Sequence, residues 1–297
     1  MSTTLHIVLA AALLSIGGCG DDTTPTDTGV ADTGVADTGA MDSSPTDTGP
    51  TDSGSGDTGD AMPPYVPDWS CLGSVTTGTP AATTADVTVT LTDFGASGPA
   101  VGASVQYCPW DDIACASPTD TGTTDSMGMV TLTLPTDPNP YWGFVTVNLT
   151  GTLLHEYYTS TPVVNDASPS AAIINETAIN VIALVLAETQ DYDTNGVIGL
   201  GALDCASRLS SGMRVELTTG SGTAFYATED GSFSASLTET STVGVWGVLN
   251  AAPGDFTATA FLGADATPIA TINFRVKAGQ VASLFMFPTP DGAAYTP

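Results

Sequence analysis

Short runs in which apolar residues alternate with threonine or serine constrain the fold of this chain more than any other feature. In the stretch 87–92, Val, Val and Leu alternate with Thr, the pattern of a strand with one buried face. Similar apolar, β-branched runs follow at 104–107, 129–134, 144–149, 197–203, 213–218, 224–228, 232–237, 243–249, 256–262, 269–276 and 281–287. Gly, Pro, Asn and Asp separate them, so the spacing predicts an all-β head beginning near Trp69.

Residues 168–192 interrupt this pattern and divide the head into two halves, 68–167 and 193–297. Four apolar residues of this segment fall on one face of a helix: Ile179, Ile182, Ala183 and Leu186. Asn175 is placed as an N-cap and Glu176 lies in the first turn, so we expect a connecting helix. The many β-branched residues keep a buried strand as the alternative.

The two halves repeat one order of elements. A Gly-x-x-Val strand (102–105 and 212–215) is followed by a Thr-rich acidic hairpin (124–130 and 228–233), and the second half adds Pro-Gly-Asp-Phe at 253–256. This order resembles carboxypeptidase-regulatory-like domains, although the first half lacks the Pro-Gly-x-Phe element. The resemblance implies two tandem immunoglobulin-like or transthyretin-like β-sandwiches. In that family such modules are non-catalytic spacers, stabilising domains or binding domains of bacterial surface proteins.

The N-terminus has the pattern of an export signal. Residues 7–14 form an apolar run that is too short to span a bilayer, which takes about 20 residues. The sequence Ile16-Gly17-Gly18-Cys19 resembles the bacterial lipobox, which implies removal of 1–18 and a lipid on Cys19. The first six residues contain no Lys or Arg, which departs from the signal pattern. Because the motif is short, a non-lipidated secretory signal with an incidental cysteine stays as the alternative. Gly20 stands where aspartate would favour inner-membrane retention, so we expect the outer membrane.

Residues 19–67 are expected to form the lipid anchor and a disordered tether. Aspartate recurs there every five residues, mostly as Asp-Thr-Gly or Asp-Ser-Gly, with no apolar periodicity. Asp-Thr-Gly is also the aspartic-protease signature, but these copies lie in Thr- and Pro-rich sequence. We expect the one later copy, Asp120-Thr121-Gly122, in a loop. A protease is therefore not predicted.

The charge balance excludes one class of partner. The chain has 4 Lys and Arg against 32 Asp and Glu, a net charge of -28. Nucleic acid binding depends on Lys and Arg at the phosphates, so we predict no nucleic acid partner.

Beyond Cys19, four cysteines remain, an even number that suits disulfides in an oxidising compartment. Cys108 and Cys115 could close a small loop, which leaves Cys71 for Cys205, although four cysteines allow three pairings. A metal site is the rival, but the paired Cys-x-x-Cys spacing is missing. Within the loop, an exposed Trp110 beside two aspartates, Asp111 and Asp112, could form a binding tip or cap the loop.

The sequence carries little that could support catalysis. His6 is expected to leave with the signal, and His155-Glu156 has Thr159 where a zinc protease needs its second histidine. No Gly-x-Ser-x-Gly elbow accompanies His155, so we expect a structural or solvent-facing histidine in a strand-like segment.

One weak metal candidate remains. Asp191, Asp193 and Asn195 fit the first half of a calcium loop, but Ala202 occupies the twelfth position where a bidentate carboxylate is required. An ordinary interdomain turn is the alternative. No other cofactor is expected.

We therefore predict a non-enzymatic lipoprotein of the bacterial cell envelope that presents two β-sandwich modules. It would serve structural display or bind a protein, glycan or envelope component, with the membrane as a partner through Cys19. Two alternatives are a calcium-dependent adhesion or scaffold protein and a non-catalytic accessory to a secreted hydrolase.

Overall fold

The computed structural model describes residues 65–218 and 220–295 of the chain. The first half contains β1 (Thr84–Asp93), β2 (Gly98–Pro99), β3 (Ser104–Pro109), β4 (Asp120–Thr123), β5 (Met129–Pro135), β6 (Gly143–Asn148) and β7 (Leu154–Thr159). The connecting segment contains β8 (Ser170–Ile173) and α1 (Glu176–Val185). The second half contains β9 (Gly196–Ala202), β10 (Met213–Leu217), β11 (Thr223–Ala227), β12 (Phe233–Ser234), β13 (Val245–Ala251), β14 (Gly254–Leu262), β15 (Pro268–Val276), β16 (Gln280–Met286) and the short 3-10 helix η1 (Pro290–Gly292). The prediction of a mostly β fold is confirmed. Neither helix is long or apolar enough to span a lipid bilayer, a finding that covers the described residues.

The alternation that predicts strands also decides which face is buried. In β1 the side chains of Val87, Val89 and Leu91 are buried. Thr88 lies on the other face, where its hydroxyl is 2.9 Å from that of Thr131 on the neighbouring β5. Apolar and polar residues separate in this way because successive side chains of a strand point to opposite faces.

The strands form three sheets. A small sheet has the order β2-β1-β5, with β8 also paired to β1, and a second has the order β10-β14-β15. The nine-stranded sheet has the order β12-β11-β13-β9-β16-β7-β6-β3-β4. Buried side chains of β1 and β5 pack against those of β3, β6 and β7, and those of β14 and β15 pack against β9, β13 and β16. The nine-stranded sheet is therefore the common layer of two sandwiches.

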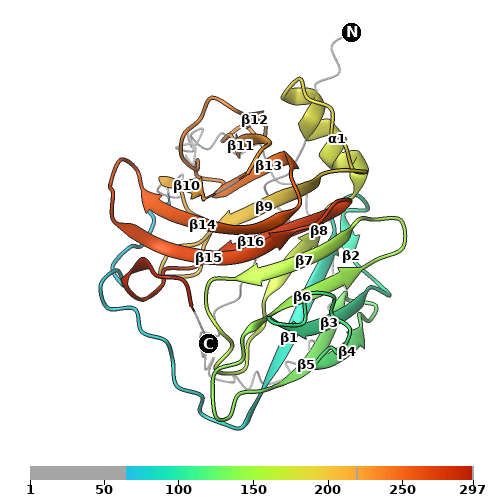
Figure 1. Ribbon diagram of the computed structural model, residues 1–297, viewed down its shortest axis with the longest axis vertical. Helices are drawn as coiled ribbons and strands as arrows, with labels where there is room; N and C mark the ends of the chain where they lie inside the picture. The colour runs from blue at the N-terminus through green and yellow to red at the C-terminus, as the bar shows by residue number, and fades with distance from the viewer. Residues whose placement is uncertain (1–64, 219, 296–297) are drawn as a thin grey trace, which may run out of the picture. The chain divides into compact units, whose positions relative to one another are not determined.

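The last strand of the chain joins the two predicted modules, which the sequence does not reveal. β16 lies between β7 of the first half and β9 of the second and is parallel to both (Figure 1). The two halves also share a core, because Phe144 and Tyr158 of the first half pack in one cluster with Trp246 and Phe274 of the second. The described residues from Val66 onward accordingly belong to one compact unit.

The connecting segment contains the helix that the sequence predicts. Asn175 is the N-cap of α1, and its Oδ1 accepts a hydrogen bond of 2.9 Å from the backbone N–H of Ala178. Ile179, Ile182 and Ala183 are buried against the face of the nine-stranded sheet formed by β9, β13 and β16. The same segment also contains β8, which pairs in parallel with β1, so both alternatives for 168–192 occur within it.

Two local predictions are wrong. Asp120-Thr121-Gly122 is not a loop but part of β4, an edge strand on which Asp120 Oδ2 accepts a hydrogen bond of 2.7 Å from the backbone of Thr133. The strand expected at 232–237 is shortened to β12, because the hydroxyl of Ser234 bonds the backbone N–H of Ser236 at 3.1 Å. Such local bonds compete with sheet pairing.

Candidate functional site

The two predicted disulfides are both present and each fastens one part of the head to another. Cys108–Cys115 closes a small loop between β3 and β4, with Cα atoms 5.3 Å apart. We call residues 109–114 the clamp loop. Cys71–Cys205 joins the segment before β1 to the turn after β9, across 134 residues of sequence.

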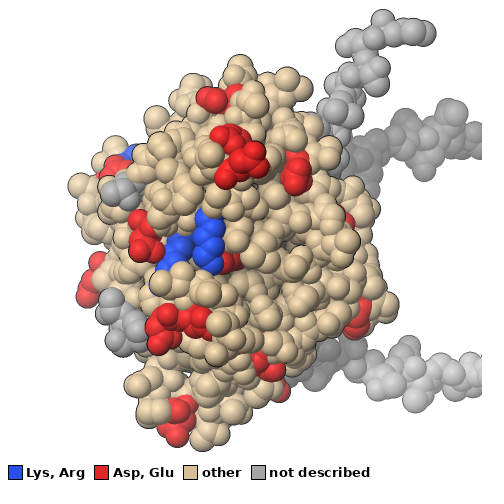
Figure 2. All heavy atoms as spheres, turned by 45° about the vertical axis from the view of Figure 1, so that its right-hand side comes forward, with Lys and Arg blue, Asp and Glu red and all other residues tan. Residues whose placement is uncertain are grey.

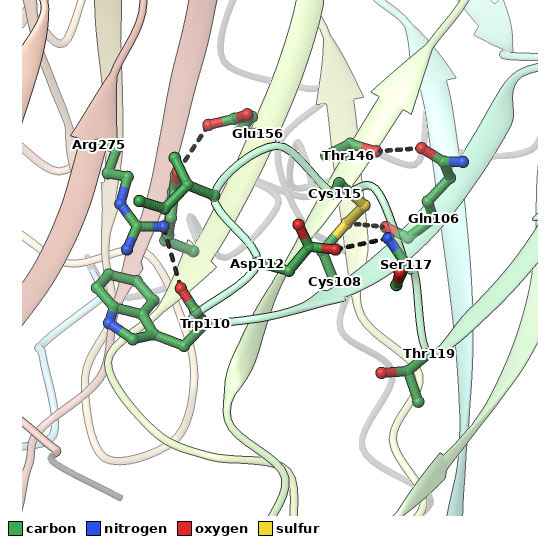
Figure 3. The surroundings of a disulfide bond; sticks show 12 residues. Gln106, Cys108, Trp110, Asp112, Cys115, Ser117, Thr119, Thr146, Glu156 and Arg275 are labelled. Atoms are coloured by element: carbon green, nitrogen blue, oxygen red, sulfur yellow. Dashed lines mark hydrogen bonds between the residues drawn. A yellow bond between two sulfur atoms is a disulfide. The ribbon is translucent and has the colours of Figure 1, made fainter.

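The clamp loop is held by two basic residues at the end of β15. Arg275 Nη1 donates a hydrogen bond of 3.0 Å to the carbonyl oxygen of Trp110, and its guanidinium lies 4.7 Å from the centre of the indole ring (Figure 3). Lys277 Nζ donates a hydrogen bond of 2.9 Å to the carbonyl oxygen of Ile113. A loop of the first half is thus tied to a strand of the second.

A buried carboxylate completes this cluster. Glu156 on β7 is 2 % exposed, and its Oε1 lies 2.5 Å from Lys277 Nζ. Its Oε2 accepts a hydrogen bond of 2.6 Å from the hydroxyl of Tyr158. Burial, with the negative charge of Glu156 adding to it, raises the pKa of Tyr158, so the phenol stays a donor. Both carboxylate oxygens therefore have partners.

Trp110 is not the exposed tryptophan that the sequence predicts. Its side chain is partly buried and packs against Trp142 and Tyr158, with ring centres 5.8 and 6.0 Å away. Together with Arg275 these rings cover the indole, so the structure favours the cap over the binding tip. Asp112 in the same loop accepts a hydrogen bond of 2.6 Å from the backbone of Ser117, which lowers the pKa of its carboxyl.

The basic residues of this cluster are functional residues that sequence reasoning missed. The chain has only four Lys and Arg, and two of them, Arg275 and Lys277, hold the clamp loop. Figure 2 shows a face of the molecule with a small central patch of Lys and Arg among scattered Asp and Glu. The Arg-x-Lys spacing at the end of a strand is a signal that could have found them, because residues two positions apart lie on the same face of a strand.

The Cys71–Cys205 disulfide is reinforced by hydrogen bonds between the segments that it joins. Asp204 Oδ2 accepts a hydrogen bond of 2.8 Å from the backbone N–H of Asp68, and Cys205 N–H donates one of 2.8 Å to the carbonyl of Asp68. Trp69 and Leu72 pack against the core shared by the two halves. The segment that follows the expected tether is therefore bound firmly to the second half.

The calcium candidate forms a turn in which its first carboxylate is already engaged. Asp191 Oδ1 accepts a hydrogen bond of 3.0 Å from the backbone of Asp193, and Oδ2 accepts one of 2.5 Å from the hydroxyl of Thr194. The Thr194 hydroxyl is the main reason why the pKa of Asp191 is lowered. Asn195 donates its side-chain amide to Thr194 at 3.1 Å. In the described residues no group of three His, Cys, Asp or Glu is arranged to hold a metal, and calcium binding stays a prediction.

His155 is a structural histidine. It lies on β7, which is covered on both faces, and its side chain has no exposed surface. Its Nε2 lies 3.0 Å from the carbonyl oxygen and 3.2 Å from the backbone nitrogen of Ile174. Burial lowers the pKa of His155 to about 4, so the ring is neutral at pH 7.

This buried ring predicts a pH dependence of stability. We expect the free energy of unfolding to fall by about 3 kcal/mol as the pH is lowered from 6.5 to 4. The pKa of His155 is about 4 in the folded protein against 6.5 in an unfolded chain, so the unfolded chain takes up the proton in this window. Urea denaturation at pH 7, 5.5 and 4 measures the change. The His155→Gln variant should lose this component, and a wild type equally stable at all three values would contradict the prediction.

Cys19, the signal at 1–18 and the tether up to residue 64 lie outside the described residues. Their predicted roles therefore stay predictions.

Comparison with known proteins yields structural similarity only. No protein-family model and no curated protein matches the chain. Among solved structures, the Bacillus anthracis TIE protein is 12 % identical over 70 % of this chain and 34 % of its own, with a TM-score of 0.23. The shaft pilin SpaA from Lactobacillus rhamnosus GG is 13 % identical over 72 % of this chain and 100 % of its own, at 0.22. An intradiol ring-cleavage dioxygenase from Tetranychus urticae is 17 % identical over 32 % of this chain and 61 % of its own, at 0.19. At such values no function is transferred from any of them to this chain.

Proposed function

We propose that this chain is a non-enzymatic lipoprotein of the bacterial cell surface that displays a rigid β head on an acidic tether. The head would serve structural display or bind a protein, a glycan or an envelope component. The lipid on Cys19 would connect it to the outer membrane.

The proposal rests on one observation: the cysteines, the buried ion pair and the Arg–Trp contact of the head hold its segments together. Two disulfides, the buried Glu156–Lys277 pair and the Arg275 contact with Trp110 all connect one segment of the head to another. Side chains engaged in this way stabilise a fixed shape and do not face a substrate. A fixed shape suits a module that must hold its surface unchanged outside the cell, where disulfides persist.

The residues that could suggest an enzyme support the same proposal. His155 is sealed in the interior, so a substrate cannot reach its ring. The carboxylate of Asp120, in the Asp-Thr-Gly copy, accepts hydrogen bonds from the backbone N–H groups of Thr121 and Thr133, at 2.8 and 2.7 Å. Both side chains thus have structural roles in the head, which fits a non-enzymatic module.

The anchor is tested by localising the full chain in a bacterium with an outer membrane. We expect the protein in the outer-membrane fraction, and mass spectrometry should find an acylated N-terminal cysteine at position 19. The Cys19→Ser variant should move to the soluble fraction, and Gly20→Asp, as the matched control that keeps the cysteine, should stay membrane-bound but shift to the inner membrane. A free N-terminus at another residue, or a Cys19→Ser variant that remains in the membrane, would reject the anchor.

A further inference from the structure

The first sandwich contains an apolar cavity of about 440 Å³ between its two sheets. Val87, Val89 and Leu91 of β1 line one wall, and Tyr157 of β7 and Phe285 of β16 line the other. Sandwich cores normally contain few voids larger than a water molecule. This volume is within the range of small-molecule sites and about three times the ~150 Å³ of an engineered cavity that binds benzene.

The cavity stays open because its rim is fastened at two points. Residues 161–169, which lead from β7 to β8, line the mouth. Val163 exchanges two backbone hydrogen bonds of 2.9 Å with Tyr141. Further along, Ala167 donates to the carbonyl of Asp86 at 3.1 Å and accepts from Thr88 at 2.8 Å. The rim is thus held in place by hydrogen bonds, so it does not collapse onto the apolar walls.

Tyr107 contributes a polar hydroxyl to this apolar space. Tyr107 on β3 is 5 % exposed and lines the cavity. The hydroxyls of the neighbouring Tyr141 and Tyr157 bond Thr119 and the carbonyl of Ala172. Within the described part of the chain, the Tyr107 hydroxyl has no hydrogen-bond partner. It is therefore free to bond a molecule in the cavity.

Charge narrows the class of ligand. The lining contains neither Lys nor Arg, and its one charged residue is Asp166, whose Oδ1 accepts a hydrogen bond of 2.8 Å from the backbone of Asp86. With no cation at the site and a net charge of -28 on the chain, a carboxylate, sulfate or phosphate would be repelled. The apolar walls offer a charged group of either sign no partner in exchange for its lost hydration, so an uncharged ligand suits this site best.

We propose that this cavity binds an uncharged, mostly hydrocarbon molecule of two or three rings whose single hydrogen-bonding group meets the hydroxyl of Tyr107. The site is independent of the anchor and of the clamp loop, and it adds a small-molecule ligand to the display role.

The test uses the full chain and the uncharged fluorescent probe N-phenyl-1-naphthylamine. We expect saturable binding at one site per chain. The neutral 2-naphthol should displace the probe at a concentration at least tenfold lower than the anionic 2-naphthoate. The Tyr107→Phe variant should bind 2-naphthol about five- to tenfold more weakly, the loss expected for one hydrogen bond, and bind 2-methylnaphthalene unchanged.

A second variant fills the cavity. Ala171 on β8 is buried and lines the cavity, so Ala171→Phe should abolish probe binding with its melting temperature retained. The matched control is Leu184→Phe, which adds a ring at an exposed position of α1 and should bind as the wild type does. The proposal is overturned if the wild type shows no saturable binding or if the carboxylate displaces the probe as well as the alcohol does. Probe binding that survives in a folded Ala171→Phe variant also overturns the proposal. If that variant does not fold, the deciding result is Tyr107→Phe: an unchanged affinity for 2-naphthol overturns the proposal.

Discussion

Replacing Cys71 and Cys205 with serine is expected to lower the free energy of unfolding by about 4–5 kcal/mol. The two residues are 134 positions apart, so their bond removes a large amount of conformational freedom from the unfolded chain. The contacts of Trp69 and Leu72 with the shared core are held in place by the same bond. Urea denaturation of the oxidised wild type and of the double variant measures the difference.

The other disulfide supplies the matched control. Cys108 and Cys115 are 7 positions apart, and replacing both with serine should cost about 2–3 kcal/mol, because a short loop restricts the unfolded chain less. The clamp loop keeps its bonds to Arg275 and Lys277 in that variant. If the Cys108/Cys115 double variant were the less stable of the two, the Cys71–Cys205 disulfide would not be the bond that stabilises the head most.

The Lys277→Met variant is expected to lose about 4 kcal/mol of stability. Glu156 is 2 % exposed and would be left in the interior with Tyr158 as its one remaining side-chain partner. An unpaired buried charge costs more than the pair contributes, because the desolvation of the carboxylate is no longer compensated. Thermal and urea denaturation at pH 7 measure the loss.

A second substitution shows whether the buried charge is the cause. Adding Glu156→Gln to Lys277→Met removes the charge and should recover more than half of the lost stability. The control is Arg214→Met, whose partner Glu216 is largely exposed, and which should cost about 1 kcal/mol or less. Equal losses in the single and double Lys277 variants would show that packing of the lysine stem, and not charge, is what the head needs.

Local features of the head could be predicted from the sequence because they depend on neighbouring residues. The alternation in β1 reports which side chains are buried, and the side chain of Asn175 caps the helix that begins one residue later. The closeness of Cys108 and Cys115 in the chain indicates that they could close a loop, and the structure contains this bond. In each case the interacting groups lie within a few residues of one another.

The clamp loop could not be predicted in the same way. Trp110 has partners at positions 142, 158 and 275, and no pattern around it indicates them. Glu156 reads as a strand residue of the first half and Lys277 as a turn residue of the second, yet their charged groups are 2.5 Å apart. The cavity beside Tyr107 is likewise a property of how two sheets and one rim segment meet.

The sequence by itself determined the mostly β composition of the head, the positions of most strands, the capped helix and the disulfide-forming cysteines. Only the tertiary structure decided that β16 lies between β7 and β9, that the two sandwiches share a sheet and a core, and that two of the chain's few cations hold the clamp loop. The physical reason is that side-chain alternation specifies which face of a strand is buried but not which strand lies beside it. Strand neighbours are chosen by packing between residues far apart in the chain, and the shared core and the clamp loop arise from that packing.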